Sequence, residues 1–258
     1  MTRINLFEFG DKHWCPRIIR DTMTVYLGYL FGKKMNVYKS AIPIIKKVLQ
    51  VTRKRRILEL CAGAGFHGSR LQRELDGMDM KVGVTLTDKY PNVAAFEREK
   101  EINPKVTFIR EPVDATRVPR SIEGVRVMYG SFHHFNPEQA RKILQDTVDK
   151  EDAICVFEGM GPYPGAFVAM LFVPLMVIDI VRQMMHPIGC KRFILTYIIP
   201  VLPLIVLWDA IASMLRIYMP HELTALVKRI RGKSFKWEIG IGRGKMTYLV
   251  GYPRITPK

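Results

Sequence analysis

The sequence predicts an α/β protein whose mostly parallel sheet ends in an antiparallel strand. From Ile57 onward, short apolar runs alternate with helical stretches, a pattern typical of βαβ units with right-handed crossovers. Near the end of the chain, two further strand-like runs flank Gly242-Arg-Gly244, which indicates a hairpin. The 258 residues are enough for one large domain with a substantial core.

The expected elements follow from the spacing of apolar side chains. Residues 14–50 show helical spacing and predict helices punctuated by Gly32 and Pro43. The expected parallel strands are Ile57–Leu60, Val82–Thr87, Val106–Arg110, Val125–Tyr129 and Ala153–Phe157. The helices expected between them are Gly68–Leu75, Val93–Ile102 and Pro137–Val148, and the hairpin strands are Phe235–Gly240 and Met246–Gly251.

The chain divides into three expected parts. Residues 1–50 form a helical N-terminal segment, and residues 51–162 together with 223–258 form the α/β unit. Residues 163–222 form an apolar helical insertion before the last hairpin. We expect the ligand site at the carboxyl edge of the parallel strands, because ligands of such sheets bind there.

Positive charge is concentrated towards the two ends of the sequence. The net charge is +16; residues 1–56 and 182–258 each carry 13 Lys and Arg against 3 Asp and Glu, whereas residues 57–181 carry 14 against 18. A nucleic-acid-binding domain more often spreads its charge over its whole surface, so we expect no nucleic-acid partner. Two basic flanks suit an anionic lipid surface or an anionic substrate, with an ordinary solvated surface as the alternative.

The cysteines and the first residues bear on metals and compartment. Because none of the four cysteines forms a CxxC pair, we expect no metal site. Free thiols within apolar runs fit a reducing compartment. The sequence begins without an apolar core of signal-peptide length, so we expect a cytoplasmic protein.

The strongest local signal is a glycine-rich turn between the first expected strand and the following helix. Gly63, Gly65 and Gly68 allow a tight turn and close approach of a ligand to the backbone. The helix begins with free N–H groups that face such a ligand. A lone GxGxxG pattern is weak evidence and suits a dinucleotide equally well.

Acidic and small residues follow the next three strands. Asp88 ends the second strand, where a carboxylate can accept hydrogen bonds from both ribose hydroxyls of a nucleotide cofactor. Asp114 follows the third strand, where it can accept from an adenine amino group. The fourth strand leads into Gly130-Ser-Phe-His-His-Phe135. All of these positions meet at the carboxyl edge of the expected sheet.

Together these motifs resemble the class I S-adenosylmethionine (SAM)-dependent methyltransferases, which have a Rossmann-like fold. The turn Ile57-Leu-Glu-Leu-Cys-Ala-Gly-Ala-Gly65 is similar to their first motif, an acidic residue followed after one apolar residue by Gly-x-Gly-x-Gly. The final hairpin is similar to their antiparallel last strand. The resemblance covers roughly residues 50–160 and 235–252, and Cys61 departs from it, because this position is usually the first glycine.

The resemblance implies SAM as the cofactor and gives the strand-end residues roles. Glu59 would hold the methionine amino end directly or through water, Asp88 would hold the ribose, and Asp114 and Ala115 would flank the adenine. It also implies that the N-terminal segment covers the active site. The full expected cofactor-binding set is Glu59, Cys61, Gly63, Gly65, Asp88, Lys89, Asp114, Ala115, Gly130 and Ser131.

Two histidines are candidate catalytic residues. His133 and His134 follow the fourth strand, near the expected position of the transferred methyl group, where one could accept a proton; packing or substrate shaping is the alternative. A general base is optional, because a methyl group on a sulfonium is intrinsically electrophilic. The candidates for substrate contact are Trp14, Tyr26 and Glu158.

The insertion contains two almost wholly apolar runs, Ala166–Val181 and Phe193–Trp208. Each is 16 residues long and contains proline, whereas a spanning helix needs about 20 apolar residues. Three interpretations remain open. The segment dips into one leaflet with basic residues on head groups, it forms a substrate lid or a homodimer interface, or it is an internal buried pair. We favour the first.

We therefore predict a SAM-dependent methyltransferase that acts on a small apolar or lipid-like acceptor at the inner face of a membrane. One rival is an NAD(P)-dependent oxidoreductase, which the acidic Glu59 before the glycines and the final hairpin disfavour. The other is a non-catalytic membrane-associated adaptor, which the presence of Glu59, Asp88 and Asp114 together disfavours. The acceptor atom stays open, because fold does not fix function.

Overall fold

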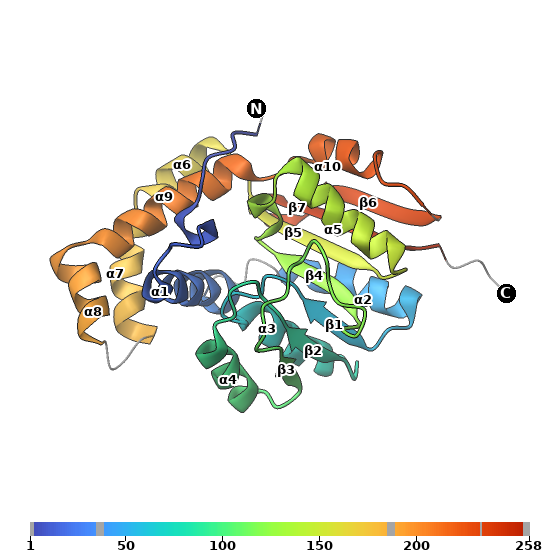
Figure 1. Ribbon diagram of the computed structural model, residues 1–258, viewed down its shortest axis with the longest axis horizontal. Coiled ribbons are helices and arrows are strands. Elements are labelled where there is room, and N and C mark those ends of the chain that lie inside the picture. The colour runs from blue at the N-terminus through green and yellow to red at the C-terminus, as the bar shows by residue number, and fades with distance from the viewer. Residues whose placement is uncertain (1–2, 35–38, 185–188, 233, 255–258) are drawn as a thin grey trace.

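A seven-stranded sheet lies at the centre of the computed structural model, which describes residues 3–34, 39–184, 189–232 and 234–254. The strand order is β3-β2-β1-β4-β5-β7-β6, with β1 to β5 parallel and β7 antiparallel to both of its neighbours (Figure 1). The strands are β1 Arg56–Glu59, β2 Gly83–Leu86, β3 Val106–Phe108, β4 Val125–Tyr129, β5 Ile154–Met160, β6 Phe235–Ile241 and β7 Met246–Pro253. This arrangement confirms the predicted fold class.

Helices cover both faces of the sheet because its central strands are apolar on both sides. Neighbouring residues Ile57 and Leu58 of β1 are both fully buried, and they belong to different core clusters. The first cluster includes apolar residues of α2, α3 and α4, and the second includes those of α5 and α10. These helices are α2 Ile42–Thr52, α3 Phe66–Asp76, α4 Val93–Ile102, α5 Pro137–Asp149 and α10 Pro220–Val227.

The N-terminal residues divide between two cores. Helix α2 packs on the sheet, and Pro43, which we expected to punctuate the N-terminal helices, lies in its first turn; a proline is tolerated there because the first N–H groups have no intrahelical partner. Helix α1 (Arg17–Leu27) and the π-helical turn η2 (Gly28–Lys34) instead join a third core with the insertion.

The insertion is a group of short helices rather than two long ones. The run expected over Ala166–Val181 breaks after α6, and the run expected over Phe193–Trp208 breaks at Ile199–Pro200. Among the described residues no single helix is long and apolar enough to span a bilayer; Cys190–Ile198 and Val201–Arg216 meet the criteria only together, across a 71° bend. The elements are α6 Pro164–Met170, α7 Val173–Met184, α8 Cys190–Phe193, η5 Ile194–Ile198 and α9 Val201–Arg216.

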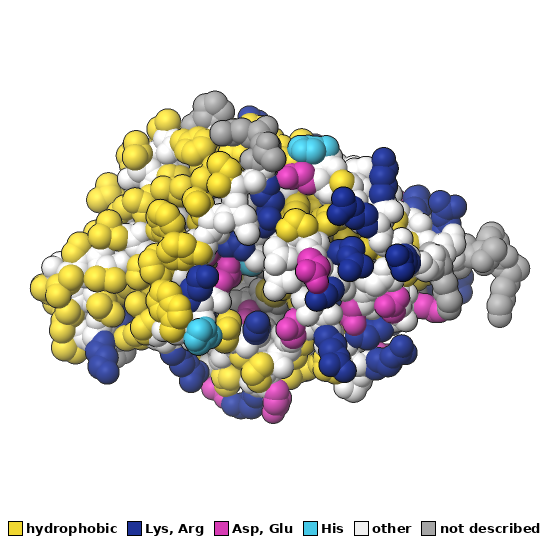
Figure 2. All heavy atoms as spheres, turned by 45° about the horizontal axis from the view of Figure 1, so that its top comes forward, with side chains coloured by type: hydrophobic (Ala, Val, Ile, Leu, Met, Phe, Trp, Pro, Cys, Tyr) yellow, Lys and Arg dark blue, Asp and Glu magenta, His cyan; other side chains and the backbone are white. Residues whose placement is uncertain are grey.

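The outer side of the insertion exposes a large number of apolar side chains. Figure 2 shows them gathered over the end of the molecule formed by these helices, with few charged side chains among them. Leu171, 73% exposed, is the most accessible of them. We call this set the apolar face; it comprises Phe167, Val168, Leu171, Phe172, Leu175, Phe193, Ile194, Ile198, Ile199, Leu204 and Trp208.

Candidate functional site at the carboxyl edge of the sheet

The glycine-rich turn connects β1 to α3 in a conformation that needs glycine. Gly63 and Gly65 have φ values of 59° and 80°, in the left-handed region that side chains disfavour. A Cβ at Gly65 would lie 2.5 Å from Leu86 Cδ1, so this glycine also permits close packing against β2. Cys61 adopts a φ of 56°, which explains physically why glycine is the usual residue at this position.

Asp88 lies directly against the turn. Its Oδ2 accepts a hydrogen bond from the Gly63 N–H at 2.9 Å, and its Oδ1 accepts one from the Tyr90 N–H at 2.8 Å. Burial raises the pKa of this carboxyl, and these backbone donors oppose the rise. A carboxylate has about four lone-pair sites, so Asp88 retains acceptor capacity for a hydroxyl of a ligand beside its backbone donors. Asp88 therefore links the shape of the turn to the end of β2.

Glu59 lies beneath the turn. Its side chain is 1% exposed, and its Oε2 has no hydrogen-bond partner among the described residues. A Cβ at Gly68 would lie 2.0 Å from this oxygen, so Gly68 leaves the space that the carboxyl occupies. Burial raises the pKa of Glu59 to about 8. The role predicted for Glu59, contact with a methionine amino group, stays a prediction.

The other predicted cofactor residues follow β2, β3 and β4. Asp114 is held by the N–H and hydroxyl of Thr116, and its neighbour Ala115 is 3% exposed. Lys89 is exposed, and its charge lowers the pKa of Asp114 after the larger effect of the hydrogen bonds from Thr116. Gly130 has a φ of 51°, and Ser131 after it is buried with a hydroxyl that has no partner among the described residues.

His133 is fixed by Glu158 at the end of β5. The imidazole Nδ1 lies 2.6 Å from Glu158 Oε2, and the His133 backbone N–H donates to Glu158 Oε1 at 3.0 Å. Because a carboxylate only accepts, Nδ1 carries the proton in this pair. In the neutral imidazole, Nε2 then has the free lone pair; it is buried, has no hydrogen-bond partner among the described residues and lies 3.8 Å from Glu8 Oε1.

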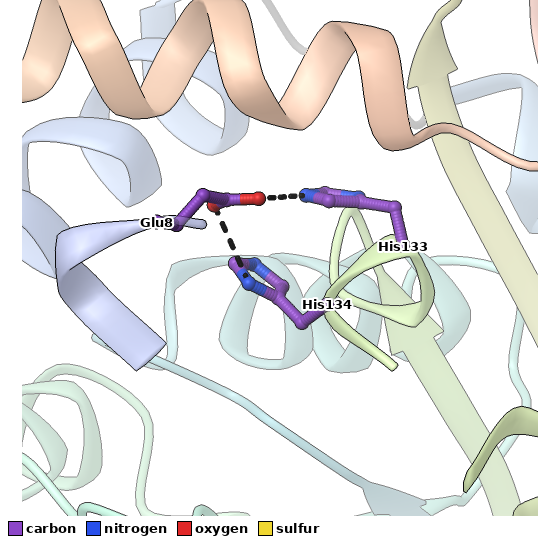
Figure 3. A group of neighbouring side chains, drawn as sticks. All are labelled: Glu8, His133 and His134. Carbon is purple, nitrogen blue, oxygen red and sulfur yellow. Dashed lines mark ion pairs between the residues drawn. The ribbon is translucent and has the colours of Figure 1, made fainter. Parts of the chain in front are cut away.

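His134 faces two carboxylates of the N-terminal segment. Its Nδ1 lies 2.7 Å from Asp11 Oδ1 and 3.4 Å from Glu8 Oε2, the second contact being drawn in Figure 3. Burial lowers the pKa of His134, but the charges of Glu8 and Asp11 outweigh it and raise the value to about 9. His134 is therefore a cation at neutral pH and a poor proton acceptor, whereas the geometry of His133 leaves a nitrogen available.

Helix α9 supplies further polar groups that the sequence analysis missed. Arg216 Nη1 contacts Glu8 Oε1 at 2.9 Å and Asp11 Oδ2 at 2.8 Å, and Ser213 donates to Glu8 Oε2 at 2.8 Å. Asp209 accepts from the N–H groups of Phe9 and Gly10 at 2.8 and 3.0 Å. Asp209, Ser213 and Arg216 are spaced by one helical turn in an otherwise apolar helix, and this is the signal that could have identified them.

The predicted substrate-contact residues lie in different surroundings. Glu158 is 1% exposed and acts through His133. Trp14 is 57% exposed and stacks edge-on with Phe9. Tyr26 is 1% exposed inside the third core, and burial raises its pKa well above the usual range. Of these three, Glu158 is the one that the structure brings into contact with a candidate catalytic histidine, His133.

Helix α1 lies over the turn. A Cβ at Gly63 would lie 3.6 Å from Thr24 Cβ of α1, and one at Gly28, where α1 ends, would lie 2.5 Å from Phe66 of α3. The side chain of Asn92, which caps α4, donates to the Thr24 hydroxyl at 3.3 Å. The N-terminal segment is therefore packed against the site from outside the sheet.

Solved structures share this architecture at low sequence identity. An O-methyltransferase family protein from Burkholderia thailandensis is 14% identical, with a TM-score of 0.50. The superposition covers 91% of this chain and 59% of the Burkholderia chain. The plantazolicin methyltransferase BpumL in complex with SAH, the demethylated product of SAM, is 12% identical with a TM-score of 0.51, covering 92% and 97%. A structure from Rhodobacter sphaeroides described as a putative Zn-dependent alcohol dehydrogenase is 12% identical with a TM-score of 0.54, covering 92% and 98%.

These likenesses define the fold. No family model matches the chain, and no curated protein matches it either. The chain spans about three fifths of the length of the Burkholderia protein. The strand order and the solved structures together show that this chain has the Rossmann-like fold of class I methyltransferases. Its chemistry follows from the site, because one fold serves many functions.

Proposed function

We propose that this chain is a SAM-dependent methyltransferase. The observation that carries the proposal is the contact of Asp88 with the glycine turn, which sets a carboxylate at the end of β2 beside a left-handed backbone. The surrounding residues fit the cofactor: the Asp88 carboxylate retains acceptor capacity beside its backbone donors, and the buried Ser131 hydroxyl has no partner among the described residues. Asp88 would hold the ribose, and Ser131 would contact the methionine end.

SAM, when bound, supplies an electrophilic methyl group. The work of the protein is then to align an acceptor and exclude water. His133 is the proposed proton acceptor, since Glu158 holds its Nδ1 and its buried Nε2 has no hydrogen-bond partner in the described part of the chain. Glu158 acts as a positioning residue. The cationic His134 joins the N-terminal segment to the loop after β4 through Glu8 and Asp11.

We propose an apolar or lipid-like acceptor that is reached at a membrane surface. The support is the apolar face, because exposed apolar patches of this kind mark membrane or protein interaction sites. Arg182 and Lys191 are exposed on the same helical group, in positions suited to anionic head groups. Helix α9 connects the apolar face to the candidate functional site, because it carries Leu204 and Trp208 on the apolar face and Arg216 at the site.

Calorimetry with three ligands tests the cofactor. We expect SAM and SAH to bind at micromolar concentration and NADH not to bind. The oxidoreductase alternative deserves this comparison because one similar structure is described as a putative alcohol dehydrogenase. The antiparallel β7 argues against it, since dinucleotide-binding sheets of this type continue with a parallel sixth strand. Absence of SAM and SAH binding at millimolar ligand contradicts the proposal.

Sedimentation with anionic liposomes at low salt tests the membrane surface. We expect the wild type to sediment with vesicles of phosphatidylserine and phosphatidylcholine, and the double variant Leu171→Asp, Leu175→Asp to stay in the supernatant. Ile102→Asp is the matched control, because Ile102 is 62% exposed but lies on α4. If all three proteins remain unbound, the membrane part of the proposal fails while the methyltransferase part stands.

A further inference from the structure

Glu8, His133 and His134 form a cluster with the composition of a metal site. One ligand atom from each residue lies within 4.8 Å of those of the other two. Figure 3 shows the two imidazoles on either side of the Glu8 carboxylate, with a nitrogen of each directed at it. Two histidines and one carboxylate are a recurrent ligand set for zinc and for ferrous iron.

The ligand atoms are close to the spacing that a metal needs. His133 Nε2 lies 3.8 Å from Glu8 Oε1, and His134 Nδ1 lies 3.4 Å from Glu8 Oε2. Ligands bonded at about 2.1 Å around a tetrahedral zinc lie about 3.4 Å apart. Asp11 Oδ1 lies 2.7 Å from His134 Nδ1, which is hydrogen-bond distance and closer than two ligands of one tetrahedral metal, so Asp11 is not part of the set. Small side-chain movements would therefore bring the set to bonding distance.

An independent observation also points to a missing ligand at this place. The His133 side chain is 6% exposed, and its Nε2 has no hydrogen-bond partner among the described residues. A buried polar atom without a partner costs free energy, so such atoms are rare unless something binds them. This nitrogen faces Glu8, and Nδ1 of the same ring is held by Glu158, the arrangement by which metal-binding histidines are oriented.

The charges around the cluster favour a cation. Three carboxylates, those of Glu8, Asp11 and Glu158, contact the two imidazoles, whereas Arg216 is the one guanidinium that contacts these carboxylates among the described residues. Arg216 reaches Asp11 Oδ2 and Glu8 Oε1, the oxygen that also faces His133 Nε2. Glu8 Oε2 and Asp11 Oδ1 remain directed at His134.

We propose that Glu8, His133 and His134 bind a divalent transition metal ion of the zinc type, which displaces the proton shared by His134 and Asp11 and leaves the fourth position open. This differs from the sequence-based expectation of no metal site, which rested on the cysteines. Binding of the ion does not depend on methyl transfer. The role we infer for it does rest on the proposed function: with the lone pair of His133 Nε2 bound to the metal, the metal would replace His133 in activating the acceptor, by binding an oxygen of the acceptor and lowering the pKa of the hydroxyl to be methylated.

Cobalt(II) titration of the chelator-treated full-length chain tests the proposal. We expect one equivalent to bind with visible absorption bands of low-symmetry cobalt, and one equivalent of zinc to displace it. Alanine at His133 or at His134 should each weaken binding at least tenfold. His221→Ala is the matched control, because it removes an exposed imidazole on α10 and should leave binding unchanged.

Glu8→Gln keeps the shape of the site if the alanine variants fail to fold. This variant should fold, as circular dichroism would verify, and should also bind cobalt at least tenfold more weakly. If the folded wild type binds neither cobalt nor zinc at stoichiometric ratio, the metal site does not exist and the cluster is an ion-pair network. Equal binding by wild type and Glu8→Gln overturns the proposal as well. The affinity for SAM, measured by calorimetry on the same samples, tests the proposed function separately, because it does not depend on whether a metal binds.

Discussion

The two sides of the site are built in different ways. On the sheet side, between β1 and β4, backbone geometry dominates: left-handed glycines, strand ends and one carboxylate that accepts from N–H groups. On the insertion side, buried side-chain charges from the N-terminal segment, the loop after β4, β5 and α9 hold each other in place. The difference teaches that the donor site depends on local sequence, whereas the proposed acceptor site depends on contacts between distant parts of the chain.

Loss of Arg216 should give the largest effect on stability. Arg216→Met leaves Glu8 and Asp11 without their guanidinium, and removing one partner of a buried ion pair costs about 3 kcal/mol or more. Urea denaturation measures this loss. Arg182→Met is the control, because that side chain is 70% exposed and pairs with Asp179 at 3.7 Å, so the loss should stay below about 0.5 kcal/mol. Equal losses for the two variants would show that the charged cluster contributes nothing.

A methyl group at Gly65 should damage the sheet side. Gly65→Ala forces a side chain into a φ of 80° and places its Cβ 2.5 Å from Leu86, so we expect a loss of about 2 kcal/mol and much weaker SAH binding. Gly77→Ala is the matched control, since Gly77 has a φ of −63° and its nearest contact is 3.5 Å. Denaturation and calorimetry on both variants measure the difference; a wild-type affinity for Gly65→Ala would contradict the geometry.

The sequence predicted the sheet side well because its signals are local. The bounds of β4 and α4 match the prediction, and the hairpin was recognised from its flanking glycines. The insertion side was not predictable in the same way, since Glu8 and Arg216 meet His134 only after folding. Helix α10 was missed, and the expected roles of individual site residues and the domain boundaries stay predictions.

The pKa of Glu59 gives a pH-dependent test. Its pKa is raised from 4.5 to about 8 in the folded protein, so the folded state binds a proton that the unfolded state releases between these values. The contribution of this group is therefore fully present below pH 4.5 and is lost as the pH rises through 8. Glu59→Gln should reduce the fall in unfolding free energy between pH 5 and 8, which denaturation at several pH values measures. An unchanged pH profile would show that Glu59 is already ionised in the folded protein over this pH range.

Replacement of Cys61 should give the smallest effect. Cys61→Gly removes the strain of a left-handed non-glycine residue and adds the flexibility of glycine to the unfolded chain, so the two effects nearly cancel. We expect a change within about 1 kcal/mol in denaturation and unchanged SAH affinity. A tenfold gain in affinity would show that this departure from the usual glycine pattern impairs the turn.

The central claim is that the carboxyl edge of β1 and β2 binds SAM, and Asp88 tests it most directly. Calorimetry with SAH should show micromolar binding to the wild type and at least tenfold weaker binding to Asp88→Ala. Asp76→Ala, which removes an exposed carboxylate at the end of α3, should bind as the wild type does. The same affinity for Asp88→Ala and the wild type, or no SAH binding to either, would contradict the account.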